Sequence, residues 1–95
     1  MISIEDACKI ALEKIPVELK IIKVVETPLF WIFTDERFEQ DIFGPCPLIV
    51  FKKDGRTSMT RYLTSGEAVA LDQGKEIPFP EYLVKSGRSK RIVQD

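Results

Sequence analysis

The fold is decided by the stretch Gly44-Pro45-Cys46-Pro47-Leu48-Ile49-Val50-Phe51-Lys52-Lys53-Asp54-Gly55-Arg56. Its run of apolar residues, mostly β-branched or aromatic, predicts a strand over Leu48–Lys53. Asp54-Gly55 then supplies the backbone freedom that reverses the chain, and Thr57–Leu63 is predicted to return as the second strand of a hairpin. A further apolar run, Leu29–Phe33, lies just upstream. Together these segments predict a small antiparallel meander.

The composition is that of an ordinary folded domain. The chain has 95 residues, 44% hydrophobic and 31% charged, which predicts a single domain over residues 1–95 with a modest core. Its 14 basic residues nearly cancel 15 acidic ones, so the net charge favours neither nucleic-acid binding nor mimicry of nucleic acid. The sequence has no histidine, which is the usual metal ligand and the easiest proton carrier near neutral pH. We therefore expect no bound metal and no cofactor.

The cysteines and the hydropathy of the chain indicate a reduced, cytoplasmic protein. Cys8 and Cys46 are far apart and lack the spacing of a metal site. They can pair as a disulfide, but we favour two reduced thiols, because free cysteine commonly behaves as a small buried hydrophobe. The first residues lack the basic start and long apolar run of a signal peptide. No apolar stretch approaches the ~20 residues that span a bilayer, so we expect no membrane contact.

An amphipathic helix is predicted near the N-terminus, over Ile4–Lys14. Ser3 is a favourable N-cap, and Asp6 three residues later nearly completes a capping box. Pro16 ends the helix because it disfavours helical dihedrals at the preceding residue. One apolar stripe recurs at helical spacing and is formed by Ile4, Ala7, Cys8, Ala11 and Ile15.

Two strands are predicted between this helix and the hairpin. Glu18–Glu26 is rich in β-branched residues, which favours a strand, and Thr27-Pro28 then forms a turn. Leu29–Thr34 is almost entirely apolar, so this strand is either central in the sheet or covered on both faces. Asp35–Phe43 follows as a surface loop.

The segment after the hairpin, from Thr64 to Ile77, has no single assignment from its residues. Thr64-Ser65-Gly66 and Gln73-Gly74 are breakers of regular structure. Glu67–Leu71, between them, fits either a helical turn or a short strand, and we favour a short helix.

A short C-terminal helix is predicted over Glu81–Lys85, with Pro80 at its first position and Ser86-Gly87 at its end. Residues 86–95 are then predicted to form a flexible basic tail. The expected architecture is α+β. The N-terminal helix packs its stripe on one face of a three- to four-stranded antiparallel sheet, and the C-terminal helix helps to cover the sheet.

The candidates for contact with a protein partner are Trp31, Asp35, Glu36, Glu39 and Asp41. Trp is enriched among interface hot spots, but a wholly apolar run favours a core position for Trp31. The acidic residues offer complementary charge to a basic partner. Such charge runs usually form solvated surface, and amide substitutions would then leave the melting temperature nearly unchanged. Catalysis by paired carboxylates is disfavoured, because it requires an acid held in an apolar pocket.

Basic residues gather near the C-terminus, where Lys85, Arg88, Lys90 and Arg91 are candidates for phosphate contact. We favour the simpler interpretation, a soluble chain end. No aromatic platform is interleaved with these charges, so we expect no nucleic-acid partner.

The order of these features resembles the YrhB-type domain, a small bacterial family grouped with the immunity proteins of polymorphic toxin systems. The shared features are the Ser-capped helix, the Trp-bearing strand, Gly44-Pro45 before Pro47–Phe51, the Lys-Asp-Gly turn and Pro80-Glu81-Tyr82-Leu83. Membership would imply a cytoplasmic α+β domain without a catalytic site that binds and neutralises a toxin domain encoded nearby. The chain departs from the family pattern by an apparent insertion near Ser65–Lys75.

From the residues and the resemblance together, we expect a non-enzymatic protein-binding domain that is a monomer or a homodimer. The alternative is a chaperone-like stress accessory domain with broad affinity for unfolded proteins. That alternative predicts an exposed apolar patch larger than about a few hundred Å².

Overall fold

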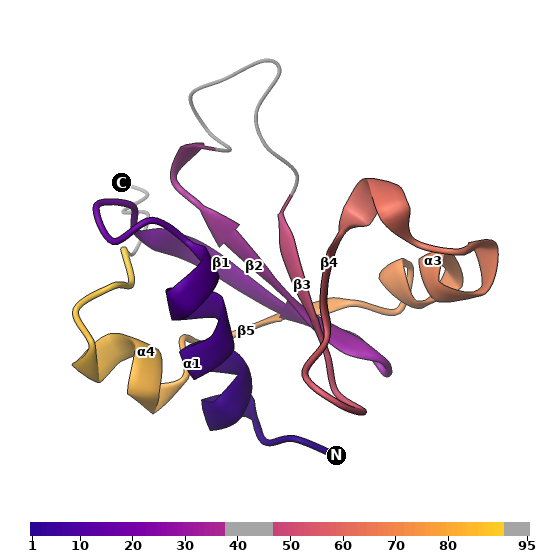
Figure 1. The fold of residues 1–95 in the computed structure, drawn as a ribbon, viewed down its shortest axis with the longest axis horizontal. Helices are drawn as coiled ribbons and strands as arrows, with labels where there is room; N and C mark the ends of the chain where they lie inside the picture. The colour runs from indigo at the N-terminus through magenta and orange to yellow at the C-terminus, as the bar shows by residue number, and fades with distance from the viewer. Residues whose placement is uncertain (38–46, 91–95) are drawn as a thin grey trace.

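The computed structural model describes residues 1–37 and 47–90 (Figure 1). Its elements follow in the order α1 (Ile4–Lys14), β1 (Ile21–Glu26), β2 (Phe30–Asp35), β3 (Leu48–Phe51), β4 (Thr57–Met59), the 3-10 helix η1 (Thr60–Tyr62), α3 (Ser65–Leu71), β5 (Lys75–Ile77) and α4 (Glu81–Lys85). This is the predicted α+β architecture, with an N-terminal helix, an antiparallel sheet and a short C-terminal helix.

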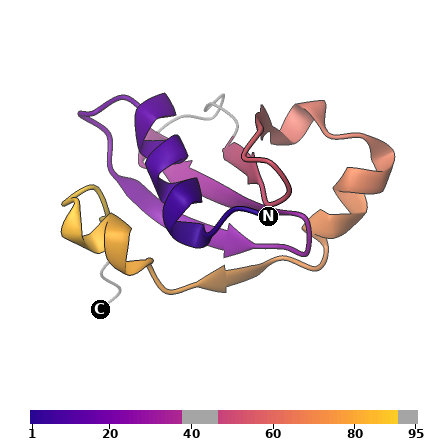
Figure 2. The ribbon, with the colours of Figure 1, turned by 60° about the horizontal axis from the view of Figure 1, so that its bottom comes forward.

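The strands form one five-stranded sheet in the order β4-β3-β2-β1-β5. The first four are the predicted meander, because each pairs antiparallel with its neighbour in sequence. β5 is an additional strand, paired with β1 at the edge opposite β4 (Figure 2). It has three residues, of which two are charged and exposed, so no apolar alternation reveals it in the sequence. The chain between β4 and β5 therefore crosses from one sheet edge to the other, and it carries η1 and α3.

α1 has the predicted boundaries and the predicted cap. The Ser3 hydroxyl accepts a hydrogen bond from the Asp6 N–H at 3.1 Å, and the Asp6 carboxylate accepts one from the Ser3 N–H at 3.4 Å. These bonds satisfy donors that a helix start otherwise leaves without partners. The small residues Ala7, Cys8 and Ala11 are fully buried, which brings the helix close to the sheet.

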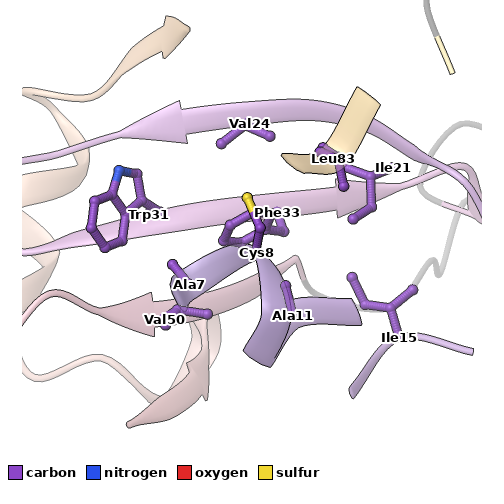
Figure 3. Close-up of a cluster of buried hydrophobic side chains, with 10 residues drawn as sticks. All are labelled: Ala7, Cys8, Ala11, Ile15, Ile21, Val24, Trp31, Phe33, Val50 and Leu83. Carbon is purple, nitrogen blue, oxygen red and sulfur yellow. The ribbon is translucent and has the colours of Figure 1, made fainter. Parts of the chain in front are cut away.

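The main core lies between one face of the sheet and the two terminal helices. Figure 3 shows Trp31 and Phe33 of β2 in this layer, with Cys8 of α1 over Phe33. Leu83 is fully buried and brings α4 into the same core. The buried members of this cluster are Ala7, Cys8, Ala11, Ile15, Ile21, Val24, Trp31, Phe33, Val50 and Leu83. Both helices therefore pack on one face, as predicted.

A second, smaller core lies on the other face of the sheet. Phe30 and Phe51 meet there edge-to-face, with ring centroids 5.5 Å apart and ring planes at 71°. Ala70 of α3 packs on this cluster, which also contains Ile32 and Ile49. Every residue of β2 is buried. The apolar run that predicted this strand is therefore both central in the sheet and covered on both faces.

The turn between β3 and β4 uses glycine as predicted, but the returning strand is shorter. Gly55 has a φ of +79°, and the Asp54 carboxylate accepts the Arg56 N–H at 2.9 Å. The sequence predicts a strand as far as Leu63, whereas β4 ends at Met59 and the chain turns through η1. The reason is tertiary, because Leu63 packs against the second core instead of extending the edge strand.

Two other boundaries also reflect local hydrogen bonding. The predicted strand from residue 18 begins only at Ile21, because the Leu19 N–H donates to the Pro16 carbonyl at 3.0 Å and closes a turn. The favoured helix near residue 67 is confirmed and begins earlier, at residue 65. The Thr64 hydroxyl accepts the Glu67 N–H at 3.1 Å, and the Glu67 carboxylate accepts the Thr64 N–H at 3.0 Å. The predicted breaker is thus a helix cap.

Gly74 fixes the junction between α3 and β5, and its substitution tests that junction. A Cβ at Gly74 would lie 2.9 Å from Val25 Cγ1 and 3.2 Å from the Leu71 carbonyl oxygen. We expect Gly74→Ala to lower the free energy of unfolding by about 1–3 kcal/mol, as overpacking does, measured by urea denaturation. The matched control is Gly66→Ala, where a Cβ meets nothing within 4 Å and helix propensity predicts a gain of up to ~1 kcal/mol. Equal effects of the two substitutions would contradict this packing.

Candidate interaction surface

Trp31 is a core residue and not an exposed anchor. Only 5% of its surface is exposed, and it lies in the core under α1. Lys52 Nζ lies 5.1 Å from the centre of an indole ring and makes a 2.8 Å ion pair with Glu26. This arrangement leaves little of the indole for a partner.

Asp35 ends β2 and is engaged by Arg37. It is 8% exposed, and its Oδ1 accepts the Arg37 N–H at 2.9 Å and Nε at 3.1 Å, while Oδ2 accepts Nη2 at 2.9 Å. Burial by itself would raise the pKa of this carboxyl, but the hydrogen bonds and positive charge of Arg37 outweigh burial and hold the pKa below its ordinary value. Asp35 is therefore an ionised, bonded residue at the end of the sheet.

Glu36 ties the end of β2 to two distant parts of the chain. Its carboxylate accepts the Lys20 N–H at 3.1 Å and the Lys90 ammonium at 3.4 Å, and its own N–H donates to the Lys20 carbonyl at 2.9 Å. Asp35 and Glu36 thus stabilise the fold, so we expect their substitution to lower the melting temperature, contrary to the expectation for a solvated loop. Glu39 and Asp41 lie outside the described residues.

The guanidinium of Arg88 is occupied at the end of α1. Its Nε donates to the Leu19 carbonyl at 3.2 Å, and Nη2 donates to the carbonyls of Ile15, Pro16 and Leu19 at 3.2, 2.8 and 3.1 Å. Carbonyls at a helix end lack intrahelical donors, and the fork of an arginine side chain reaches several acceptors at once. Arg88, which the sequence made a candidate for phosphate contact, therefore uses its guanidinium to bind main-chain carbonyls of its own chain.

The first half of the predicted tail is bonded to the sheet. The Arg88 carbonyl accepts the Ile21 N–H at 2.7 Å, and the Lys90 N–H donates to the Ile21 carbonyl at 2.8 Å. These bonds make a short parallel bridge beside β1. The expectation of a flexible tail is therefore corrected for residues 86–90, while Arg91 and the residues after it lie outside the described part.

A shallow, open groove is a further candidate binding site. An open groove of about 370 Å³ lies between α1 and α4. Its charged lining residues make exposed ion pairs, Lys85 with Glu81 at 2.8 Å and Glu5 with Lys9 at 3.5 Å. The residues lining it are Ile4, Glu5, Pro80, Glu81, Tyr82 and Lys85.

Within residues 1–37 and 47–90, no three His, Cys, Asp or Glu side chains gather to hold a metal ion. The same ranges contain no helix long and apolar enough to cross a membrane.

One surface combines a sheet edge with residue types that interfaces favour. We call it the β4 surface and define it by Thr57, Met59, Arg61 and Tyr62. Met59 is 38% exposed and Tyr62 is 66% exposed, and the Arg61 guanidinium lies 5.3 Å from the Tyr62 ring centre. Met, Arg and Tyr are enriched at protein interfaces. The sequence prediction missed this surface because it extended a strand over these residues. The enrichment of Met, Arg and Tyr at interfaces could have indicated it.

Compared with known family models, curated proteins and solved structures, the chain has no significant match.

Asp35 is expected to make the free energy of unfolding fall at low pH. Because its folded-state pKa lies below the ordinary 3.8, its contribution is present above pH ~4 and is lost as the pH falls through the lowered pKa. We expect Asp35→Asn to lower the free energy of unfolding by roughly 1 kcal/mol near pH ~7 and to reduce the decline below pH ~4. Urea denaturation across this range measures both effects. Asp72→Asn is the exposed control, and equal behaviour of the two variants would argue against the Asp35–Arg37 contact.

Cys8 is expected to be unreactive in the folded protein. Burial, with a smaller contribution from the negative charge of Glu5, raises the pKa of its thiol to about 11, and the thiolate is the reactive form. In a Cys46→Ser variant, maleimide labelling near pH ~8 should be slow and should accelerate strongly in denaturing urea. Mass spectrometry follows the label. Rapid labelling under native conditions would contradict the burial of this side chain.

Proposed function

We propose that this chain is a non-enzymatic protein-binding domain of the immunity type, which binds a cognate bacterial toxin in the cytoplasm and blocks it by occlusion. The observation that carries the proposal is the β4 surface, where exposed Met59 ends an edge strand and exposed Tyr62 follows in η1. The sequence resemblance to the YrhB-type domain supports the choice of a toxin as the partner.

The β4 surface suits a protein partner better than a small molecule. Tyr62 presents a large ring that has few side-chain torsions to immobilise, and Arg61 beside it restricts the ring further. An aromatic residue with an arginine neighbour is typical of an interface hot spot. The edge strand adds backbone donors and acceptors, which are used when a partner strand joins a sheet.

The acidic residues are proposed to contribute charge. Asp35 and Glu36 are held in contacts within the fold. Glu39 and Asp41 follow in the sequence and remain predicted contributors to the encounter with a basic partner. Charge of this kind acts mainly on the association rate and is weakened by salt.

Tyr62→Ala tests the proposal, with the product of the neighbouring gene as the partner. We expect the dissociation constant to rise by about 30-fold or more, the effect of removing a hot-spot side chain of ~2 kcal/mol. The melting temperature should change little, because most of the ring is exposed. Tyr82→Ala, the same substitution on α4, is the matched control and should leave the affinity unchanged. Calorimetry measures the affinity, and protection of cells from the toxin measures neutralisation.

Two outcomes would replace this proposal. A neighbouring gene product that is neither toxic nor bound would remove the immunity function. Broad suppression of aggregation across unrelated unfolded proteins, without a single tight partner, would instead favour the chaperone-like function.

A further inference from the structure

α3 packs on the sheet through a small apolar contact. The helix has seven residues, and Ala70 is the one of them that is buried. Leu71 beside it is partly buried against the second core. Helices shorter than about 12 residues are marginally stable in water by themselves, so α3 depends on this packing. α1, on the other face, has 11 residues and buries Ala7, Cys8 and Ala11.

The backbone hydrogen bonds of this region join it to itself. N–H groups in and after α3 donate to carbonyls three or four residues earlier, at distances from 2.8 to 3.2 Å. The donors are Ala68, Asp72, Gln73 and Gly74, and the acceptors are Thr64, Val69, Ala70 and Leu71. β4 and β5, the strands before and after this region, are bonded to β3 and β1. The region can therefore leave the sheet without breaking a strand pairing.

Within residues 1–37 and 47–90, one polar side-chain contact joins α3 to the rest of the fold. Arg56, in the turn before β4, places Nη2 at 3.4 Å from Glu67 Oε2. Its guanidinium carbon also lies 4.3 Å from the centre of the Phe51 ring in the second core. The Arg56 side chain is 61% exposed, and ion pairs in contact with water contribute little to stability.

The two ends of the region are fixed to the sheet. Leu63, just before it, packs against the second core. Gly74, at its other end, lies so close to β1 and the turn after it that a Cβ would be 2.9 Å from Val25 Cγ1 and 3.3 Å from Thr27 Cγ2. Residues 64–74 are thus attached at both ends and weakly held between them.

We propose that residues 64–74 form a lid, which opens as a unit while the sheet, α1 and α4 stay folded. The Arg56–Glu67 contact holds the lid closed, and opening uncovers part of the second core, on the face of the sheet opposite α1 (Figure 1). Segments with few buried apolar contacts open locally at a lower free energy than global unfolding requires. The lid belongs to the free chain and is measured without a partner, so it stands or falls separately from toxin binding.

The two capping boxes provide matched variants for a first test. Thr64→Ala removes the N-cap hydroxyl of α3, and Ser3→Ala removes that of α1. Thr64→Ala should accelerate amide exchange of residues 70–74 about fivefold, the usual effect of a lost cap, measured by NMR. Ser3→Ala should leave these rates unchanged, because α1 stays folded when the lid opens. Equal effects of the two variants would show that α3 opens only by global unfolding and would overturn the proposal.

The contact that holds the lid closed has a separate test. Arg56→Ala should accelerate exchange of the same amides about threefold, the effect of losing an exposed ion pair. Glu26→Gln, which breaks the 2.8 Å pair with Lys52 outside the lid, is the control and should leave them unchanged. Exchange in α3 should also depend less on urea than exchange in β2, because lid opening exposes less surface than global unfolding. The same urea dependence in both elements would contradict a local opening.

Thiol labelling measures the opening independently of amide exchange. In the Cys46→Ser background, Ala70→Cys places a thiol at the buried position of the lid, and Cys8 is a buried thiol under α1. The introduced thiol should react with a maleimide at least about tenfold faster than Cys8, because the lid opens more often than the whole chain unfolds. Mass spectrometry of the digested protein separates the two sites. Equal labelling rates would overturn the inference.

Discussion

The structure depends on the burial of β2 on both faces. All six of its residues are buried, with Trp31 and Phe33 in one core and Phe30 and Ile32 in the other. A strand of this kind is stable only if two neighbouring strands satisfy its backbone and a further layer covers each face. α1 and α4 provide one layer, and the segment that contains α3 contributes to the other. The remaining elements are arranged around this requirement.

The polar side chains at the end of this sheet serve mainly to join segments that are distant in sequence. Arg88 binds carbonyls at the end of α1, and Glu36 binds Lys20 and Lys90, whereas Asp35 binds its near neighbour Arg37. A domain of this size buries a limited apolar area, so bonds that fix the chain ends to the sheet make a useful contribution. These charged residues therefore stabilise the fold, and their charge alone does not indicate a partner.

For function, the structure shifts attention from the acidic segment that begins at the end of β2 to the β4 edge of the sheet. Trp31, the aromatic residue that the sequence made a candidate for partner contact, is enclosed by the core and by Lys52. Tyr62 was less conspicuous in the sequence but is 66% exposed beside an edge strand. Arg61 lies next to this ring, and Met59 at the end of β4 is also exposed.

The sequence alone determined α1, the four-strand meander, the glycine turn and α4, because each depends on neighbours in the chain: a Ser3 cap, apolar runs, Asp54-Gly55 and Pro80. Only the tertiary structure decided β5, the early end of β4 and the roles of Asp35, Glu36 and Arg88. β5 pairs with a strand some fifty residues earlier, Lys75–Ile77 against Val24–Glu26, and it has no apolar pattern of its own. A charged side chain likewise looks the same in sequence whether it meets water or a carbonyl from a distant segment. Contacts between remote segments are created by packing, and local patterns do not encode them.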